Sequence, residues 1–246
     1  MNLPLAHISF PVHLIIQAKA KVKRKFLKSK DCIMGQINSR RRSVRAAAPA
    51  EPSSATLSNT LALGAGCYWG TEKYVRKNFQ DKFPGSIKSC SVGFMSPERP
   101  EPKYRKPTYQ QVCSGASGHI EVLYVELNDP EKYFEELIRF FFQFHDPTTR
   151  NRQGNDRGFQ YASWIFCADE AQVAIATKVR DELQAAIDER AVICYENKVI
   201  STKITPLTEF TKAQADHQQY LAKNPNGYCN HRIRLKEWVE VQASDE

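Results

Sequence analysis

The sequence predicts an α+β fold, a two-layer sandwich of helices on a mixed or antiparallel sheet, with an irregular C-terminal tail. From about Thr60 onward, short apolar runs typical of strands are interspersed with longer stretches in which apolar residues recur every three or four positions. Strands and helices do not fall into separate blocks, which favours one body in which helices cover a sheet. A chain of 246 residues is long enough to bury one large core.

The first elements of this body are a strand and a helix. The apolar run 61–63 predicts a short buried strand that leads into glycines, and a helix is expected from near Cys67 through Phe79. Alternating apolar residues over 87–94 predict a second strand. The prolines between 97 and 107 then predict a loop.

The middle of the chain is again predicted to alternate strands with a helix. Residues 120–127 form a strongly apolar run and are expected to be a strand. Asp129 and Pro130 are a helix N-cap followed by proline at the first helical position, so a helix is expected from there to about Phe142. Residues 161–166 are strand-like.

The last part opens with a long helix. Asp169 is its expected N-cap, and apolar residues continue on one face as far as Ile187. A strand over 200–204 and a helix over 211–221 are expected to follow, before an irregular tail.

The charge of the chain is concentrated at its beginning. The formal net charge is +8, yet residues 1–50 hold eleven Lys and Arg residues and a single acid, so residues 51–246 carry a net charge of −2. We therefore divide the chain into a basic leader, 1–55, and a catalytic region, 56–246. A basic, acid-poor leader is typical of a transit peptide, which favours a plastid or a mitochondrion, with the cytoplasm as the alternative.

Composition excludes several classes of protein. No apolar stretch is long enough for a transmembrane helix. The seven cysteines are widely spaced and form no C-x-x-C pair, so neither a zinc site nor a disulfide-stapled scaffold is expected. We expect a reducing compartment, no metal, and a monomer.

The most informative stretch is Gly64-Ala65-Gly66-Cys67-Tyr68-Trp69-Gly70. A cysteine at a strand-to-helix turn faces unpaired backbone N–H groups and the positive end of the helix dipole, and both favour a thiolate. Tyr68 and Trp69 could wall an apolar pocket beside the sulfur. The alternative is a buried structural cysteine in a glycine-rich turn.

A second candidate group follows the predicted loop. Glu121 lies inside an apolar strand, where burial would raise its pKa and suit it to act as a general acid. The alternative is a glutamate on the solvent face of that strand. His119 could be a base, but the sequence favours a hydrogen-bonded structural histidine.

Two further stretches complete the set. Gly, Asn and Asp residues over 153–158 predict a tight loop that brings Asp156 and Tyr161 to one place. Cys229 lies in a tail punctuated by proline and glycine. Taken separately, the first stretch could be an ordinary turn and the second an incidental exposed thiol.

In this order, these stretches resemble the peptide methionine sulfoxide reductases of the A type, from about Thr60 to Cys229. The signature G-C-[FY]-W-G is highly specific, and residues 66–70 match it. The resemblance implies that Cys67 attacks the sulfoxide sulfur. It also implies that Tyr68 and Trp69 form a cage for the methyl group of the substrate.

The resemblance further implies roles around the sulfoxide oxygen. Tyr109, Glu121 and Tyr161 match positions that donate hydrogen bonds to this oxygen, with Glu121 as the proton donor. Asp156 matches a position that arranges the site and its water. The implied substrates are oxidised proteins, peptides or free methionine sulfoxide, as the S epimer.

The resemblance also implies how the enzyme is recycled. Cys67 becomes a sulfenic acid, Cys229 condenses with it to a disulfide, and thioredoxin, or dithiothreitol in an assay, reduces that disulfide. No cofactor is required. Many bacterial members carry another recycling cysteine after a glycine-rich tail, whereas no cysteine follows Cys229 here, so we expect a two-cysteine cycle.

Two other functions remain open from the residues alone. Cys67, His119 and Asp156 could serve an acyl-transfer enzyme that forms an acyl-cysteine. Alternatively, the basic leader could bind nucleic acid, although the rest of the chain offers no basic stripe with interleaved aromatic residues.

Overall fold

The structure, a computed structural model, describes residues 56–239. The predicted leader, 1–55, and the end of the predicted catalytic region, 240–246, lie outside the described residues. Within the described part of the chain, no helix is long and apolar enough to cross a membrane.

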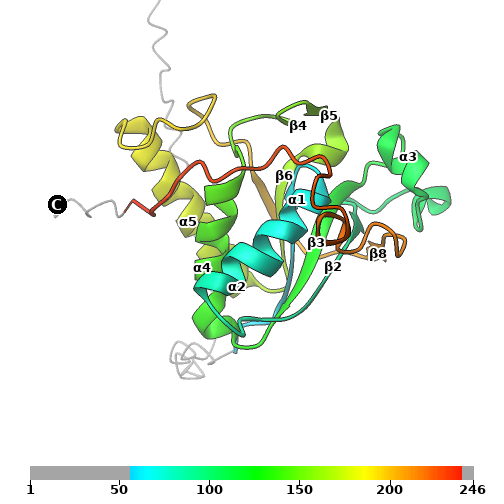
Figure 1. The fold of residues 1–246 in the computed structure, drawn as a ribbon, viewed down its shortest axis with the longest axis horizontal. Coiled ribbons are helices and arrows are strands. Elements are labelled where there is room, and N and C mark those ends of the chain that lie inside the picture. Colours follow the sequence, from blue (N-terminus) through cyan, green and yellow to red (C-terminus); the bar gives the residue numbers. More distant parts are fainter. Residues whose placement is uncertain (1–55, 240–246) are drawn as a thin grey trace, which may run out of the picture. The chain divides into compact units, whose positions relative to one another are not determined.

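A six-stranded mixed sheet forms the centre of the fold, in the order β7-β6-β1-β3-β2-β8 (Figure 1). All neighbouring strands are antiparallel except β6 and β7, which are parallel. The strands are β1 Thr60–Ala65, β2 Ile87–Met95, β3 Ile120–Leu127, β6 Ser163–Cys167, β7 Lys203–Pro206 and β8 Phe210–Lys212. β4 Arg152–Gln153 and β5 Asp156–Arg157 form a separate two-stranded hairpin.

Helices cover one face of this sheet. The long helices α4 and α5 lie side by side there (Figure 1), and their apolar faces pack with β1 and β3 in the main core. The helices are α1 Tyr68–Lys73, α2 Gln80–Lys82, α3 Tyr109–Cys113, α4 Pro130–Phe144, α5 Glu170–Asp188 and α6 Tyr220–Lys223. A π-helical turn, Tyr74–Phe79, joins α1 to α2, and 3₁₀ turns span Pro102–Tyr104 and Phe159–Tyr161.

The other face of the sheet carries a smaller core. Ile120 and Val122 of β3 are buried there, and the partly buried rings of Trp164 and Phe210 pack against this cluster. Helices packed on one face of this mixed sheet make the fold the α+β sandwich that the sequence predicts. The predicted N-caps are confirmed, since Asp129 accepts from the Lys132 N–H at 3.3 Å and Asp169 from the Gln172 N–H at 2.8 Å.

The helix expected over 211–221 was wrong. Phe210–Lys212 is instead the edge strand β8, which pairs with Gly93–Met95 of β2, and only Tyr220–Lys223 is helical. Between them, the side chain of Gln218 accepts from the Val92 N–H and donates to the Val92 carbonyl, both at 2.9 Å. Pairing with a strand far away in the sequence outweighs the local helical pattern.

Two predicted strands have different limits in the structure. The strand expected over 161–166 begins only at Ser163, because Tyr161 belongs to a 3₁₀ turn. The strand expected over 200–204 begins at Lys203, because Ser201 N–H donates at 2.8 Å to the Pro147 carbonyl. The loop expected between 97 and 107 is confirmed apart from its short 3₁₀ turn.

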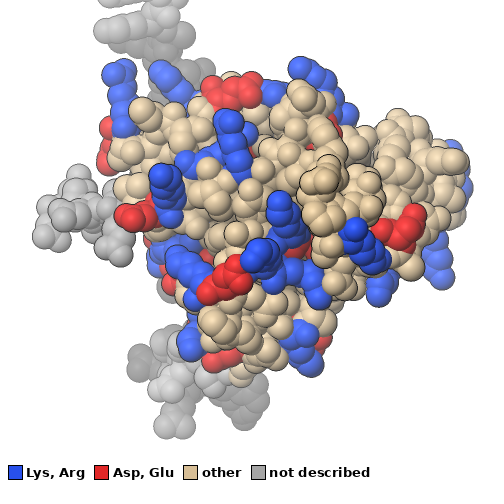
Figure 2. All heavy atoms as spheres, in the orientation of Figure 1, with Lys and Arg blue, Asp and Glu red and all other residues tan. Residues whose placement is uncertain are grey.

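The surface of the body mixes charges of both signs. Figure 2 shows Lys and Arg side chains beside Asp and Glu side chains over much of the visible face. Exposed ion pairs such as Lys77 with Asp81, 3.2 Å apart, are examples. This face agrees with the near-neutral charge of the chain beyond its leader.

Candidate active site

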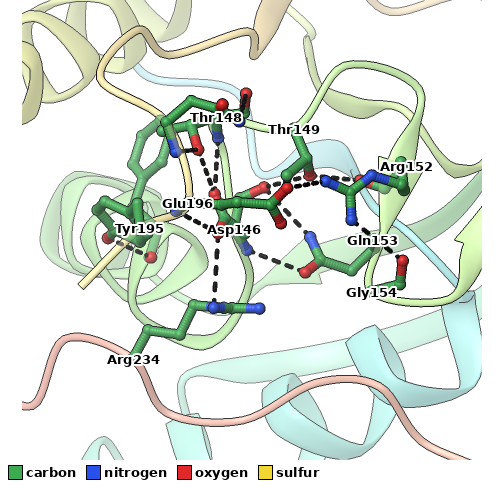
Figure 3. Close-up of polar contacts among 11 residues, drawn as sticks. Asp146, Thr148, Thr149, Arg152, Gln153, Gly154, Tyr195, Glu196 and Arg234 are labelled. Carbon is green, nitrogen blue, oxygen red and sulfur yellow. Dashed lines mark hydrogen bonds and ion pairs between the residues drawn. The ribbon is translucent and has the colours of Figure 1, made fainter. Parts of the chain in front are cut away.

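The turn between β1 and α1 presents Cys67 at the N-cap position of the helix. Gly66, just before it, has φ +94°, and a Cβ built there would lie 2.5 Å from the Cβ of Gln153. Glycine is needed at this position for both reasons. Gln153 is in turn held by hydrogen bonds with the backbone of Asp146, inside the buried polar network of Figure 3.

Glu121 lies beside this turn. It comes from the central strand β3 and is only 2% exposed. Its Oε2 accepts a hydrogen bond of 3.1 Å from the N–H of Tyr68, the residue after Cys67. Burial and the charge of Asp156 raise the pKa of Glu121 to about 8, against the opposing effect of the Tyr68 N–H. At neutral pH this carboxyl group is therefore mostly protonated, as expected of a general acid.

The pKa of Cys67 differs from the sequence-based expectation. Burial, followed by the charge of Glu121, raises it above its usual value, although the N–H groups of Trp69 and Gly70 lower it. The helix N-terminus acts in the expected direction but is outweighed by desolvation. Burial therefore opposes the thiolate that the helix N-terminus favours, and the resting Cys67 side chain is a thiol.

Two phenols face the same carboxyl group. Tyr109 begins the short helix α3 and Tyr161 ends a 3₁₀ turn, and both are half-buried. Burial is the main cause that raises both pKa values, and the charge of Glu121 raises both further. The neighbouring Cys113 side chain raises the pKa of Tyr109 as well. Both tyrosines therefore remain hydrogen-bond donors at neutral pH.

The aromatic residues after Cys67 contact the tail of the chain. Tyr68 is 1% exposed, and its hydroxyl lies 2.8 Å from Nδ1 of His217. Trp69 stacks on Tyr220 with ring centroids 3.8 Å apart. The His217 ring also lies 4.7 Å from that of Tyr109, centroid to centroid. Aromatic rings of α1, α3 and the tail thus meet around one histidine.

Asp156 connects the hairpin β4–β5 to the tail. Its carboxylate accepts from the Tyr228 hydroxyl at 3.1 Å and from the Asn230 side-chain amide at 2.9 Å. These two residues flank Cys229, which is half-buried. Of the residues that the sequence singled out, hydrogen bonds join Tyr68 to Glu121, and Asp156 to both neighbours of Cys229. The charges of Glu121 and Asp156 both act on Cys67.

The remaining cysteines of the described residues are also free thiols. Cys167 is buried in β6, Cys90 accepts a hydrogen bond of 3.2 Å from the Arg76 guanidinium, and Cys113 contacts Tyr109. Within residues 56–239, no group of three or more His, Cys, Asp and Glu side chains is arranged to hold a metal ion.

The acyl-transfer arrangement is not formed. His119 is buried, its Nδ1 lies 2.9 Å from the Ser117 carbonyl oxygen, and burial lowers its pKa. It lines a cavity with Arg99, Arg105 and Glu209, and no hydrogen bond among the described residues joins it to Cys67.

Comparisons with known proteins give the family. A family model described as peptide methionine sulfoxide reductase matches residues 59–245. The chain belongs to this family. The peptide methionine sulfoxide reductase MsrA of Pseudomonas aeruginosa is 44% identical over 169 residues, which cover 69% of this chain and 71% of the relative. A probable peptide methionine sulfoxide reductase of Schizosaccharomyces pombe is 39% identical over 167 residues, 68% of this chain and 89% of the relative.

Solved structures of the family share the fold. The reduced form of Mxr1 from Saccharomyces cerevisiae aligns with a TM-score of 0.61 and 35% identity, covering 73% of this chain and 93% of that one. Methionine sulfoxide reductase A of Corynebacterium diphtheriae aligns with a TM-score of 0.57 and 34% identity, covering 70% and 77%. The reaction of this reductase family is the thiol-dependent reduction of methionine sulfoxide.

Three residues around the site of this reductase had no role predicted from the sequence. His217 contacts the aromatic pocket, His231 lies behind the Cys67 turn, and Gln153 supports that turn. The only signal was the clustering of histidines near Cys229, in His217-Gln218-Gln219-Tyr220 and Cys229-Asn230-His231. Local patterns cannot show that both histidines fold back onto a turn about 150 residues earlier.

Proposed function

We propose that Cys67 attacks the sulfur of methionine sulfoxide while Glu121 protonates the sulfoxide oxygen. The proposal is supported most directly by the hydrogen bond of 3.1 Å from the Tyr68 N–H to Glu121. This bond fixes a carboxyl group that is protonated at neutral pH next to the nucleophile.

Cys67 and Glu121 together supply and accept every proton that moves in this step. The Cys67 sulfur first bonds to the substrate sulfur. That bond and the substrate S–O bond then break, the oxygen bonds to the Cys67 sulfur, and methionine leaves. Glu121 gives its proton to that oxygen and recovers one from the Cys67 thiol. Methionine sulfoxide and a thiol thus become methionine and a sulfenic acid, and one reductant, the thiol, is oxidised.

The surrounding side chains suit this substrate. The Tyr109 and Tyr161 hydroxyls can donate to the sulfoxide oxygen as its negative charge grows. The rings of Tyr68 and Trp69 offer an apolar surface for the methyl group, and Asp156 orders the loop beside it. We take the S epimer of methionine sulfoxide, free or within oxidised proteins, as the substrate.

Cys229 is the proposed resolving cysteine. Its sulfur attacks the Cys67 sulfenic acid, the S–S bond forms, and water leaves. An external dithiol must then supply two electrons, and we propose thioredoxin in the cell and dithiothreitol in the assay. No organic cofactor or metal enters this cycle.

The test is the reduction of methionine sulfoxide by each reductant. Cys67→Ser is expected to lose activity with both, because no sulfenic acid can form. Cys229→Ser is expected to retain activity with dithiothreitol and lose it with thioredoxin. Cys194→Ser, a half-buried cysteine without a role in the cycle, is the matched control. Full activity of Cys67→Ser would refute the nucleophile, and full thioredoxin-dependent activity of Cys229→Ser would refute the resolving role.

A further inference from the structure

His231, two residues after Cys229, is buried directly behind the nucleophile turn. Its side chain is 7% exposed, and its Nε2 lies 2.7 Å from the carbonyl oxygen of Ala65, the last residue of β1. Its own carbonyl accepts from the Tyr74 hydroxyl at 3.2 Å. The histidine is therefore bonded both to the strand before Cys67 and to the helical segment after it.

The second glycine of the signature makes room for this ring. A Cβ built on Gly70 would lie only 2.0 Å from Nδ1 of His231, and 2.7 Å from two of its ring carbons. Any larger residue at position 70 would collide with the buried imidazole. Gly70 and His231 thus form a matched pair between the turn and the tail.

The hydrogen bonds also define the state of the imidazole. Since a carbonyl oxygen only accepts, Nε2 carries a proton and donates to Ala65. Burial, the largest cause, lowers the pKa of His231 to about 4, so the ring is neutral at pH 7. Nδ1 then keeps its lone pair, and it lies 4.0 Å from the sulfur of Cys229.

The chain is held on the far side of His231 as well. The N–H groups of Arg232 and Arg234 donate to the carbonyls of Phe144 and Gln143, at 3.3 and 2.8 Å. The guanidinium of Arg234 lies 3.5 Å from the buried carboxylate of Asp146 (Figure 3). The tail is therefore fixed from His231 to Arg234.

We propose that His231 is a positioning residue for the resolving step. It fastens the tail to the Cys67 turn, so that Cys229 stays within reach of the Cys67 sulfenic acid. Two residues of extended chain span at most about 7 Å, so a fixed residue 231 confines residue 229 to the neighbourhood of the turn. This inference rests on the proposed function, in which Cys229 condenses with oxidised Cys67.

The step that His231 supports is balanced without another reactant. The Cys229 sulfur bonds to the Cys67 sulfur, the bond between the Cys67 sulfur and its hydroxyl breaks, and the hydroxyl leaves with the thiol proton as water. His231 takes no part in the earlier transfer of oxygen from the substrate. Its loss should slow disulfide formation and leave methionine formation intact.

The experiment is a single turnover of the reduced full-length protein with one equivalent of methionine sulfoxide and no reductant. One sample is quenched to measure methionine, and a second to measure the Cys67–Cys229 disulfide and dimedone-trapped sulfenic acid. The variants are His231→Ala, His231→Asn and His231→Gln. Arg232→Ala, an exposed neighbour, is the control.

In His231→Ala and His231→Asn, disulfide formation is expected to slow by roughly tenfold to a hundredfold, the cost of a small displacement of a reacting group. The Gln side chain can bring an amide N–H near the Nε2 position, so His231→Gln should recover most of the rate. Methionine formation should remain near the wild-type rate in all variants, with sulfenic acid accumulating in the slow ones.

Two results would overturn the inference. One is a wild-type rate of disulfide formation in His231→Asn, and the other is no recovery in His231→Gln relative to His231→Asn. If His231→Ala does not fold, the Asn and Gln variants decide alone. Absence of methionine from the wild-type turnover would instead refute the proposed function.

Discussion

Glu121 is the buried carboxyl group that we propose as the proton donor. In Glu121→Gln, the Tyr68 N–H keeps an acceptor but the proton donor is lost. We expect the sulfoxide-reduction step to slow by roughly 10² or more. The pKa of about 8 also predicts that the wild-type step slows as the pH rises above 8, when the carboxyl group ionises. Single-turnover methionine formation between pH 6 and 10 measures both effects, and an unchanged rate in the variant would contradict the assignment.

The same substitution should stabilise the fold. Because the pKa of Glu121 is raised from 4.5 in an exposed carboxyl to about 8, the folded state holds a proton that the unfolded state releases. Stability therefore falls as the pH rises from 4.5 to 8. At pH 7 we expect Glu121→Gln to be more stable by on the order of 3 kcal/mol. Urea unfolding at pH 5 and pH 7 tests this, since the difference should fall to about 1 kcal/mol or less at pH 5.

The residues that the sequence identified are those that carry local signals. Cys67 lies in a specific motif, and Glu121 interrupts an apolar strand. The state of the Cys67 thiol was not predictable, because it depends on burial and on the charge of a residue from another strand. His231 was missed for a similar reason, since its partners, Ala65 and Gly70, are some 160 residues away.

At the scale of elements, the Asp169 cap links the start of helix α5 to the segment that leads into strand β1. The Asp169 side chain accepts from the Gln172 N–H at the start of α5 and from the Ser58 N–H before β1, both at 2.8 Å. Burial opposes its charge, but these two N–H groups outweigh burial and lower its pKa. The stabilisation is therefore present above the ordinary pKa of 3.8 and is lost as the pH falls through the lowered pKa.

Asp169→Ala should cost about 1–2 kcal/mol of stability and leave methionine sulfoxide reduction unchanged. Urea unfolding at pH 7 measures the cost. Asp181→Ala, an exposed position within α5, is the matched control and should differ little from wild type. An equal loss in both variants would show that the cap is not responsible.

Elements were predictable where local signals and long-range pairing agree. α4 and α5 carry a cap and a continuous apolar face, and both start where the sequence predicts. In residues 211–221, local signals and long-range pairing disagree. β8 forms by pairing with β2, and the Gln218 side chain holds the chain that follows. Neither contact leaves a periodic pattern.

At the scale of the whole molecule, the residues of the proposed site, from Cys67 to His231, all lie within residues 56–239. The hydrogen bonds described above join them to one another and to neighbours in the same range. We propose that residues 1–55 direct the protein to an organelle and contribute nothing to catalysis.

Deleting residues 1–55 should leave the thermal midpoint and the reductase activity unchanged, and should change where the protein accumulates. The matched experiment fuses residues 1–55 to a fluorescent reporter, which should then enter a plastid or a mitochondrion. A diffuse cytosolic signal from that fusion would contradict the targeting role. A loss of activity on deletion would contradict the division of the chain.

The long-range bonds of the site also set the order in which it can be assembled during synthesis. Tyr68 meets Glu121 across 53 positions, whereas Ala65 meets His231 across 166 positions. From Glu121 to Cys229 the ribosome adds a further 108 residues, which takes roughly 5–20 s. An unfinished chain therefore carries the proposed nucleophile, Cys67, and its proposed acid, Glu121, for several seconds before Cys229, the proposed resolving cysteine, exists. If Cys67 is oxidised in that interval, the chain has no tail with which to form the disulfide.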